Sequence, residues 1–256
     1  MKFLGQRIQR FASVDSTNAV ARRLAECGAP EGTCIVAGTQ SAGRGRLGRE
    51  WHSPPGGLWL SVILRPRVAP RDIGKLSLVA GVAATEAIRE VVRLPAMTKW
   101  PNDVVVAGKK VCGVLVEGRW QGGIADFLVA GIGINVAIDL AALPPGVRAA
   151  AGTLLEPRDP NALAVREALL GSLLKELETF YRRFLSGDFS GILEKARLYS
   201  DTLGRQVVAA GSDARIQGTA VDIDSDAALI VRTPLGDVRV VSGDVTIRGV
   251  SGGYSG

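Results

Sequence analysis

Arginine alternates with glycine at residues 43–49 (GRGRLGR), and this run holds the side chains best suited to chemistry. Arg44, Arg46 and Arg49 supply fixed positive charge and paired N–H donors that suit phosphate. The glycines let the backbone approach a ligand and turn its N–H groups toward an anion. The run fits the dinucleotide pattern GxGxxG, but two prolines follow within residues 50–57, where a helix should begin, and no GK[ST] is present. We therefore expect a mobile anion-binding loop rather than a solvated basic segment or an RNA-binding arm.

A second group, Lys99 to Asp103 (KWPND), follows the end of a short predicted strand. Its Pro-Asn-Asp turn fixes the place of Lys99. Lys110 lies across a predicted hairpin in which Gly108 permits a tight turn. A single lysine of this kind is usually an ordinary surface residue, but two lysines beside an arginine loop indicate a clamp for a polyphosphate.

The elements that must position these groups follow from the hydrophobic pattern. Asp15 or Ser16 can cap a helix that Gly28 ends. Strands are expected at 33–39 and 58–65, with a long Gly- and Pro-containing loop at 40–57 between them. The pattern continues with a helix at 72–93, a hairpin from 104–107 and 111–118, a strand at 125–136, a loop at 139–158, a helix that Asp159 and Pro160 begin, and a shorter helix at 188–199.

The pattern of hydrophobic residues changes near residue 203. Short β-rich runs separated by Asp- and Gly-containing turns fill residues 203–250 and predict a small antiparallel barrel. We expect two domains, at 1–200 and 201–250, followed by a flexible tail at 251–256.

Composition and charge exclude several classes of protein. The chain has 256 residues, of which 46% are hydrophobic and 22% charged, so it is neither disordered, collagen-like nor a coiled coil. No apolar run reaches the length of a membrane helix, and the N-terminus MKFLGQRIQR is too polar for a signal peptide. Three separated cysteines fit neither a disulfide framework nor a metal site, so a cytoplasmic location is expected. Of the net charge of +6, residues 203–256 contribute −1 (five Arg, six Asp), which places the basic excess in the first part.

Several motifs together resemble the biotin–protein ligases. They are STN (16–18), TQSAGRGRLGREWHSPPGGLWLSVILRP (39–66), KWPNDVVVAGKKVCGVLVE (99–117), GIGIN (131–135) and the stretch from LGRQV to SGDVTI (203–247). The resemblance covers nearly the whole chain. It implies a mixed α/β catalytic domain of the class II synthetase-like kind, followed by an SH3-like barrel. It also implies a two-step reaction, in which biotin and ATP form biotinyl-5′-AMP with the help of Mg²⁺, and a lysine of a carrier protein then takes the biotinyl group.

The resemblance assigns roles to individual residues. The biotin head group is expected to contact Ser16, Thr17, Asn18 and Gln40, and the loop residues Arg44, Gly45 and Arg46 to close over biotin and the acyl phosphate. Lys99 and Arg46 are the expected catalytic residues, with Lys99 near the bond that is made and broken. Nucleotide contacts are expected from Arg49, Trp51, Lys110 and Asn135. Simpler roles stay open: Ser16 as a helix cap, Gln40 as a partner of loop backbone, Trp51 as core, Asn135 as a strand end, and His52 as a structural or exposed residue.

The expected partner is the biotin carrier domain of acetyl-CoA carboxylase. Because STN begins at residue 16, we expect a short form without an N-terminal DNA-binding domain and without specific DNA binding. Homodimers occur in the family, and the sequence identifies neither the oligomeric state nor the Mg²⁺ ligands. Two alternatives are kept: a lipoate-type ligase, and a nucleic-acid-binding module using the barrel and the basic loop. We also expect residues 41–54 to become ordered when ligand binds.

Overall fold

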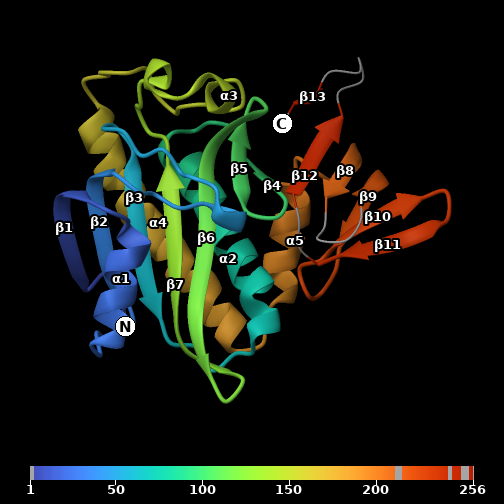
Figure 1. The fold of residues 1–256 in the computed structure, drawn as a ribbon, viewed down its shortest axis with the longest axis horizontal. Helices are drawn as coiled ribbons and strands as arrows, with labels where there is room; N and C mark the ends of the chain where they lie inside the picture. The colour runs from blue at the N-terminus through green and yellow to red at the C-terminus, as the bar shows by residue number, and fades with distance from the viewer. Residues whose placement is uncertain (1–2, 211–214, 242–243, 249–253, 256) are drawn as a thin grey trace.

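A computed structural model describes the chain except for residues 1–2, 211–214, 242–243, 249–253 and 256. The described chain is built on two β-sheets (Figure 1). The first is a seven-stranded mixed sheet of order β1-β2-β3-β7-β6-β5-β4, in which β1 runs parallel to β2 and the other pairs are antiparallel. Its strands are β1 (Arg7–Val14), β2 (Thr33–Gln40), β3 (Leu58–Leu64), β4 (Met97–Lys99), β5 (Asp103–Val106), β6 (Lys109–Gln121) and β7 (Ile124–Ile134).

Helices cover both faces of this sheet (Figure 1). Alternate residues of a strand point to opposite faces, and the core divides in the same way. Val36 and Leu60 belong to the large core with the helices α2 and α4, whereas Ile35, Ile63 and Phe127 pack against the helix α1. The small residues Ala80, Gly81, Ala83 and Ala84 of α2 are buried, which lets this helix approach the sheet closely. The helices are α1 (Thr17–Glu26), α2 (Ile73–Val91), α3 (Pro145–Arg148), α4 (Ala162–Leu185) and α5 (Ser190–Leu198).

The second sheet forms a small antiparallel domain, and the five strands expected there are all present. Its strand order is β11-β10-β9-β8-β12-β13. Residues 251–253 and 256 of the expected flexible tail lie outside the described residues, and Tyr254–Ser255 pair with β12. The strands are β8 (Gln206–Ala210), β9 (Arg215–Ile223), β10 (Leu229–Thr233), β11 (Gly236–Val240), β12 (Asp244–Arg248) and β13 (Tyr254–Ser255).

The structure adds one strand that the sequence did not predict, and it corrects the start of one helix. The sequence did not predict β1, because this edge strand is largely exposed and rich in polar residues, so it carries no hydrophobic alternation. The helix expected to begin at Asp159 and Pro160 begins at Ala162 instead, after Asn161. The carboxylate of Asp159 accepts a hydrogen bond from the Asn161 backbone N–H at 2.7 Å, so Asp159 closes a turn in front of the helix rather than capping it.

The KWPND turn is fixed by hydrogen bonds to the C-terminal part of the chain. The Trp100 backbone N–H donates to Thr202 Oγ1 at 3.0 Å, and its indole N–H donates to the carbonyl of Ala227 at 2.9 Å. A β-bridge joins Thr98 to Ser200 just before this turn. The backbone that carries Lys99 is therefore held between the first sheet and the small antiparallel domain.

We predict that Trp100→Phe lowers the free energy of unfolding by about 1–3 kcal/mol, because the buried carbonyl of Ala227 loses its donor. Trp120→Phe is a matched control, since the Trp120 indole N–H is also buried but has no hydrogen-bond partner among the described residues. Urea unfolding of both variants measures the difference. Equal destabilisation by the two substitutions would show that the Trp100–Ala227 hydrogen bond does not secure this junction.

Candidate active site

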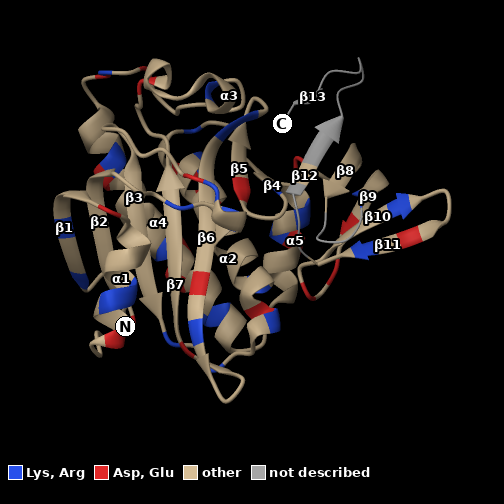
Figure 2. Cartoon of the chain, viewed as in Figure 1, with Lys and Arg blue, Asp and Glu red and all other residues tan. Residues whose placement is uncertain are grey.

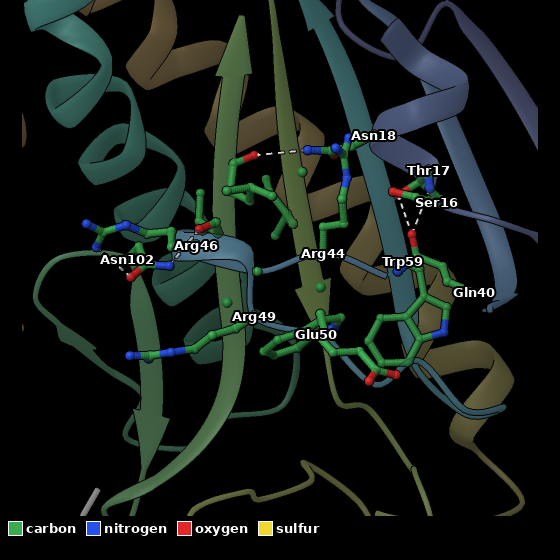
Figure 3. Close-up of a pocket in the computed structure, with 18 of the residues that line it drawn as sticks. Ser16, Thr17, Asn18, Gln40, Arg44, Arg46, Arg49, Glu50, Trp59 and Asn102 are labelled. Atoms are coloured by element: carbon green, nitrogen blue, oxygen red, sulfur yellow. Dashed lines mark hydrogen bonds between the residues drawn. The ribbon is translucent and has the colours of Figure 1, made fainter. Parts of the chain in front are cut away.

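Two neighbouring cavities open beside the arginine–glycine loop. The first lies between this loop, the first turn of α1 and the central strands (Figure 3), and the second lies between the loop, the KWPND turn and the segment 143–151. The first encloses about 120 Å³ and the second about 440 Å³. Both are lined by the same six residues, which form a shared wall: Arg49, Glu50, Trp51, Asn102, Asp103 and Lys110. The two cavities can therefore hold two ligands whose reactive ends meet at this wall.

The head of the first cavity is a set of polar groups at the start of α1. Ser16 accepts a hydrogen bond from the Ala19 backbone N–H as the helix cap, and it also lines the cavity. The backbone N–H of Thr17 donates to Gln40 Oε1 at 2.7 Å, and the Thr17 hydroxyl lies 3.0 Å from the same oxygen (Figure 3). The Gln40 amide nitrogen then donates to the Ser53 hydroxyl at 2.7 Å. The predicted head-group residues are thus brought together, and Gln40 also fixes the far end of the loop.

Glycines at the centre of the sheet make room for larger side chains. Gly113 on β6 pairs with Gly133 on β7, and a Cβ at either place would lie 2.8 or 2.6 Å from the indole of Trp51. A Cβ at Gly131 would lie 2.2 Å from Asn18 Oδ1. Because contacts of this length are too short for carbon, the bare backbone is required for Trp51 and Asn18 to lie where they do.

Trp51 packs against the core and lines both cavities, and its predicted contact with the nucleotide stays a prediction. Its ring meets the Trp59 ring edge-on at 6.4 Å, and the Lys110 ammonium lies 5.2 Å from the ring centre. The buried indole N–H has no hydrogen-bond partner among the described residues. The nitrogen is buried against the backbone of Gly133, where a Cβ would lie 2.6 Å from it.

The arginine–glycine loop is folded back on itself by backbone hydrogen bonds. The Trp51 N–H donates to the Gly43 carbonyl at 2.9 Å, and the Gly45 N–H donates to the Arg49 carbonyl at 2.7 Å. Leu47 at the tip has φ of 56°, the left-handed region, and its side chain is exposed. The arrangement places the three arginines beside the first cavity, as predicted, and the expected ordering of residues 41–54 on ligand binding stays a prediction.

The arginines of the loop have different partners. Arg44 forms an ion pair with Glu117 at 3.2 Å. Arg46 donates to Asn102 Oδ1 at 3.2 Å, and burial lowers the pKa of its guanidinium although the charge of Asp103 opposes this shift. A buried cation close to the shared wall is well placed to balance negative charge on a ligand.

The two predicted lysines occupy different places. Lys110 lies at the shared wall and forms an ion pair with Asp103 at 2.7 Å. Lys99, at the end of β4, lines the second cavity but not the first. The structure therefore puts Lys110, rather than Lys99, where the two cavities meet.

The remaining predicted residues lie around the second cavity. Asn135 follows β7, and its amide donates to the carbonyl of Gly152 at 2.9 Å. Through this hydrogen bond Asn135 holds the chain around Gly152 against the end of β7, and it also lines the cavity. His52 Nδ1 lies 3.1 Å from Glu50 Oε1, and the side chain also lines this cavity. The contact with Glu50 is compatible with the structural role expected for His52.

The structure also identifies residues that the sequence did not single out. Glu117 and Ser61 hold the side chains of the first cavity, as described below, and Asn102 and Asp103 lie at the shared wall. The KWPND motif was the available signal for Asn102 and Asp103. Ser61 and Glu117 lie within the motifs at 39–66 and 99–117, but the sequence alone did not indicate what their side chains contact.

Acidic side chains are scarce around both cavities. No group of three or more His, Cys, Asp or Glu side chains suited to a metal occurs within the described part of the chain. Glu50 and Asp103 are the acidic residues that line the cavities, and both are at the shared wall. Mg²⁺ is usually held by one or two carboxylates together with substrate phosphates, so this pair fits an ion that enters with a nucleotide.

The comparisons with known proteins agree with this geometry. Residues 10–135 match the Biotin/lipoate A/B protein ligase family, and residues 202–248 match the Biotin protein ligase C terminal domain. A Biotin--[acetyl-CoA-carboxylase] ligase from Paracoccus denitrificans is 32% identical, over 93% of this chain and 100% of that protein. The Bifunctional ligase/repressor BirA of Bacillus subtilis is 32% identical, over 95% of this chain and 75% of that protein. The solved biotin protein ligase from Aquifex aeolicus in complex with biotin and ATP has a TM-score of 0.78 and 32% identity, over 95% of this chain and 99% of that one.

A mixed sheet that carries a two-chambered, cation-lined site and a small C-terminal β domain defines a carboxylate-activating protein ligase. Within that class, the chain belongs to the biotin protein ligase family. The predicted mixed α/β fold followed by a small β domain is confirmed. No helix within the described residues is long and apolar enough to cross a membrane.

Gly133→Ala is predicted to displace Trp51, because the new methyl carbon would lie 2.6 Å from the indole nitrogen. We expect stronger acrylamide quenching of tryptophan fluorescence, and the increase should vanish when Trp51 is also replaced by phenylalanine. Gly171→Ala is the control, since a Cβ at this position of α4 meets nothing within 4 Å. Unchanged quenching in Gly133→Ala would show that the glycine does not seat the ring.

Proposed function

We propose that this protein activates biotin with ATP and transfers the biotinyl group to a lysine of the biotin carrier domain of acetyl-CoA carboxylase. The observation that carries the proposal is the shared wall, where one polar cavity and one larger cavity meet at Trp51, Asp103 and Lys110. Support comes from relatives named as ligases of this kind, and from the Aquifex aeolicus protein solved with biotin and ATP. A biotin protein ligase from Leishmania major, 26% identical with a TM-score of 0.61, was solved with biotinyl-5-AMP.

The first cavity suits biotin. The hydroxyls and amides at its head complement a polar ureido ring, and Thr17 and Gln40 are already oriented by each other. From there the cavity leads past Arg46 to the shared wall, where Lys110 supplies positive charge. We infer that the carboxylate of biotin lies at this wall, because that end of the ligand must meet the nucleotide.

The second cavity suits ATP. Leu143, Val147 and Ala151 give it an apolar side for a base, whereas Lys99 and Lys110 face it with positive charge. Attack by the carboxylate on the α-phosphate forms the acyl-adenylate and releases pyrophosphate. Mg²⁺ bound with ATP would supply further charge neutralisation, with Asp103 and Glu50 as its candidate protein ligands.

Charge is the main problem in this reaction, since a carboxylate must approach a triphosphate. Preorganised cations in a partly dry site lower the cost of that approach. Lys110 is held at the wall by Asp103 at 2.7 Å, and Arg46 is held beside it by Asn102 at 3.2 Å. In the second step the carrier lysine attacks the acyl carbon and AMP leaves.

The two alternatives receive less support. A lipoate-type ligase shares the first family match, but the C-terminal match and the relatives above are named for biotin. Binding of nucleic acid by the small domain would need unpaired basic side chains. Arg205, Arg232 and Arg239 instead each form an ion pair with an aspartate. Figure 2 shows basic positions on both β10 and β11 and an acidic position on β11. The three free cysteines support our proposal of a cytoplasmic location.

ATP–pyrophosphate exchange tests the proposal directly. The purified protein with Mg²⁺ should exchange label only when biotin is added, and it should then label a biotin carrier domain. Exchange that depends on lipoate instead would assign the sister activity. No exchange with either acid would leave the activity without support.

Lys110→Met should lower kcat for biotin-dependent exchange by about 100-fold or more, because a cation is lost where charge develops. Lys109→Met is the matched control. Lys109 is exposed, and its ammonium donates a hydrogen bond to the Ala149 carbonyl outside both cavities. Lys99→Met should mainly raise the KM for ATP. If kcat falls equally in the Lys109 and Lys110 variants, Lys110 has no specific role in the reaction.

Arg46→Gly should weaken retention of the adenylate, since the loop loses its half-buried cation beside the first cavity. We expect a faster off-rate of biotinyl-5′-AMP and biotin labelling of bystander proteins. Stopped-flow release and a blot for biotin measure the two effects. If both stay at wild-type values, Arg46 does not hold the intermediate.

A further inference from the structure

A continuous series of hydrogen bonds crosses the head of the first cavity. Ser61, fully buried on β3, has its hydroxyl 2.8 Å from Thr17 Oγ1 and 2.6 Å from Asn18 Oδ1. The series joins β2, α1, β3, β6 and the loop through Gln40, Thr17, Ser61, Asn18, Glu117 and Arg44.

Asn18 has its whole amide engaged by the protein. Its oxygen lies against the Ser61 hydroxyl, and its nitrogen donates to Glu117 Oε2 at 2.7 Å and to the Leu115 carbonyl at 3.4 Å. Gly131 closes off the side of the oxygen, because a Cβ there would collide with it. This arrangement fits an anchor for the cavity better than the ligand-binding role that the sequence predicted for Asn18.

Glu117 joins this anchor to the loop. The same oxygen, Oε2, accepts from Asn18 and from the Arg44 guanidinium at 3.2 Å. Figure 3 shows the Arg44 side chain extending toward Asn18. Arg44 is one of three arginines in the loop, and Glu117 is the acidic side chain with which it forms an ion pair. Without this carboxylate, repulsion from the neighbouring cations would favour other directions for Arg44.

We propose that Glu117 is a positioning residue that aims Arg44 at the first cavity and locks the amide of Asn18. The pair is partly exposed, with 45% of the Arg44 side chain and 33% of the Glu117 side chain accessible, so it contributes little to stability. The ion pair acts instead by fixing the orientation of the Arg44 side chain. Arg44 secures the start of the loop through Glu117, and Gln40 secures its end through Ser53, so one network holds both ends beside the ligand.

The inference rests on the proposed function, since its readout is the KM for biotin. Glu117→Gln keeps the shape of the side chain and an acceptor for Asn18, but it removes the charge that holds Arg44. We expect the KM for biotin in ATP–pyrophosphate exchange to rise about tenfold, with kcat and the KM for ATP nearly unchanged, as a lost charge-assisted hydrogen bond predicts.

A double-mutant cycle tests whether Glu117 acts through Arg44. In an Arg44→Met background, Glu117→Gln should raise the KM for biotin no further. Glu167→Gln is the matched control, because Glu167 forms an exposed two-bond pair with Arg10 away from both cavities, and its KM should equal that of the wild type.

The outcomes separate the two proposals. A wild-type protein without biotin-dependent exchange overturns the proposed function. An active wild type whose KM for biotin is unchanged by Glu117→Gln overturns the role of Glu117. An equal rise in the presence and absence of Arg44 also overturns it, since Glu117 would then act without the arginine. Thermal melting of each variant confirms that the comparison is between folded proteins.

Discussion

The Trp51 indole packs directly on the backbone of Gly113 and Gly133, and the rest of the site depends on this contact. A methyl group at either glycine would lift the indole, and the indole is part of the wall between the two cavities. The ring in turn carries the Lys110 ammonium 5.2 Å from its centre. One contact between a side chain and two antiparallel strands therefore sets the shape of both chambers and the place of a cation between them.

The cations of the site are held by acidic or amide partners. Lys110 has Asp103, Arg44 has Glu117, and Arg46 has the amide oxygen of Asn102. Partners of this kind cost little at a partly exposed site, and they keep long flexible side chains in one direction before the ligand arrives. A carboxylate and a triphosphate brought to this wall would meet charge that needs no rearrangement, which is the condition for electrostatic catalysis.

Much of the fold could be predicted because hydrophobic periodicity is strong in the buried strands and in α2. β1 lacked that signal, since an edge strand with exposed polar side chains has no buried face to mark it. The same limit applies to the site. Arg44, Arg46 and Gln40 stand in sequence motifs. Ser61 and Glu117 also lie within such motifs, but they meet only through the order β3-β7-β6 and the register of those strands. The resemblance placed Lys99 near the reacting bond and Lys110 at the nucleotide, and only the structure shows that Lys110 lines both cavities.

The small β domain is part of this geometry rather than an appendage. Thr202 and Ala227 hold the backbone and indole of Trp100, and the next residue back in the chain is Lys99. Val245 of the same domain lines the second cavity. Because one side of that cavity and the turn that carries its lysine both depend on these contacts, any displacement of the small domain would alter the proposed nucleotide chamber first. The head of the first cavity is built from α1, β2, β3 and β6 and would be the last to change.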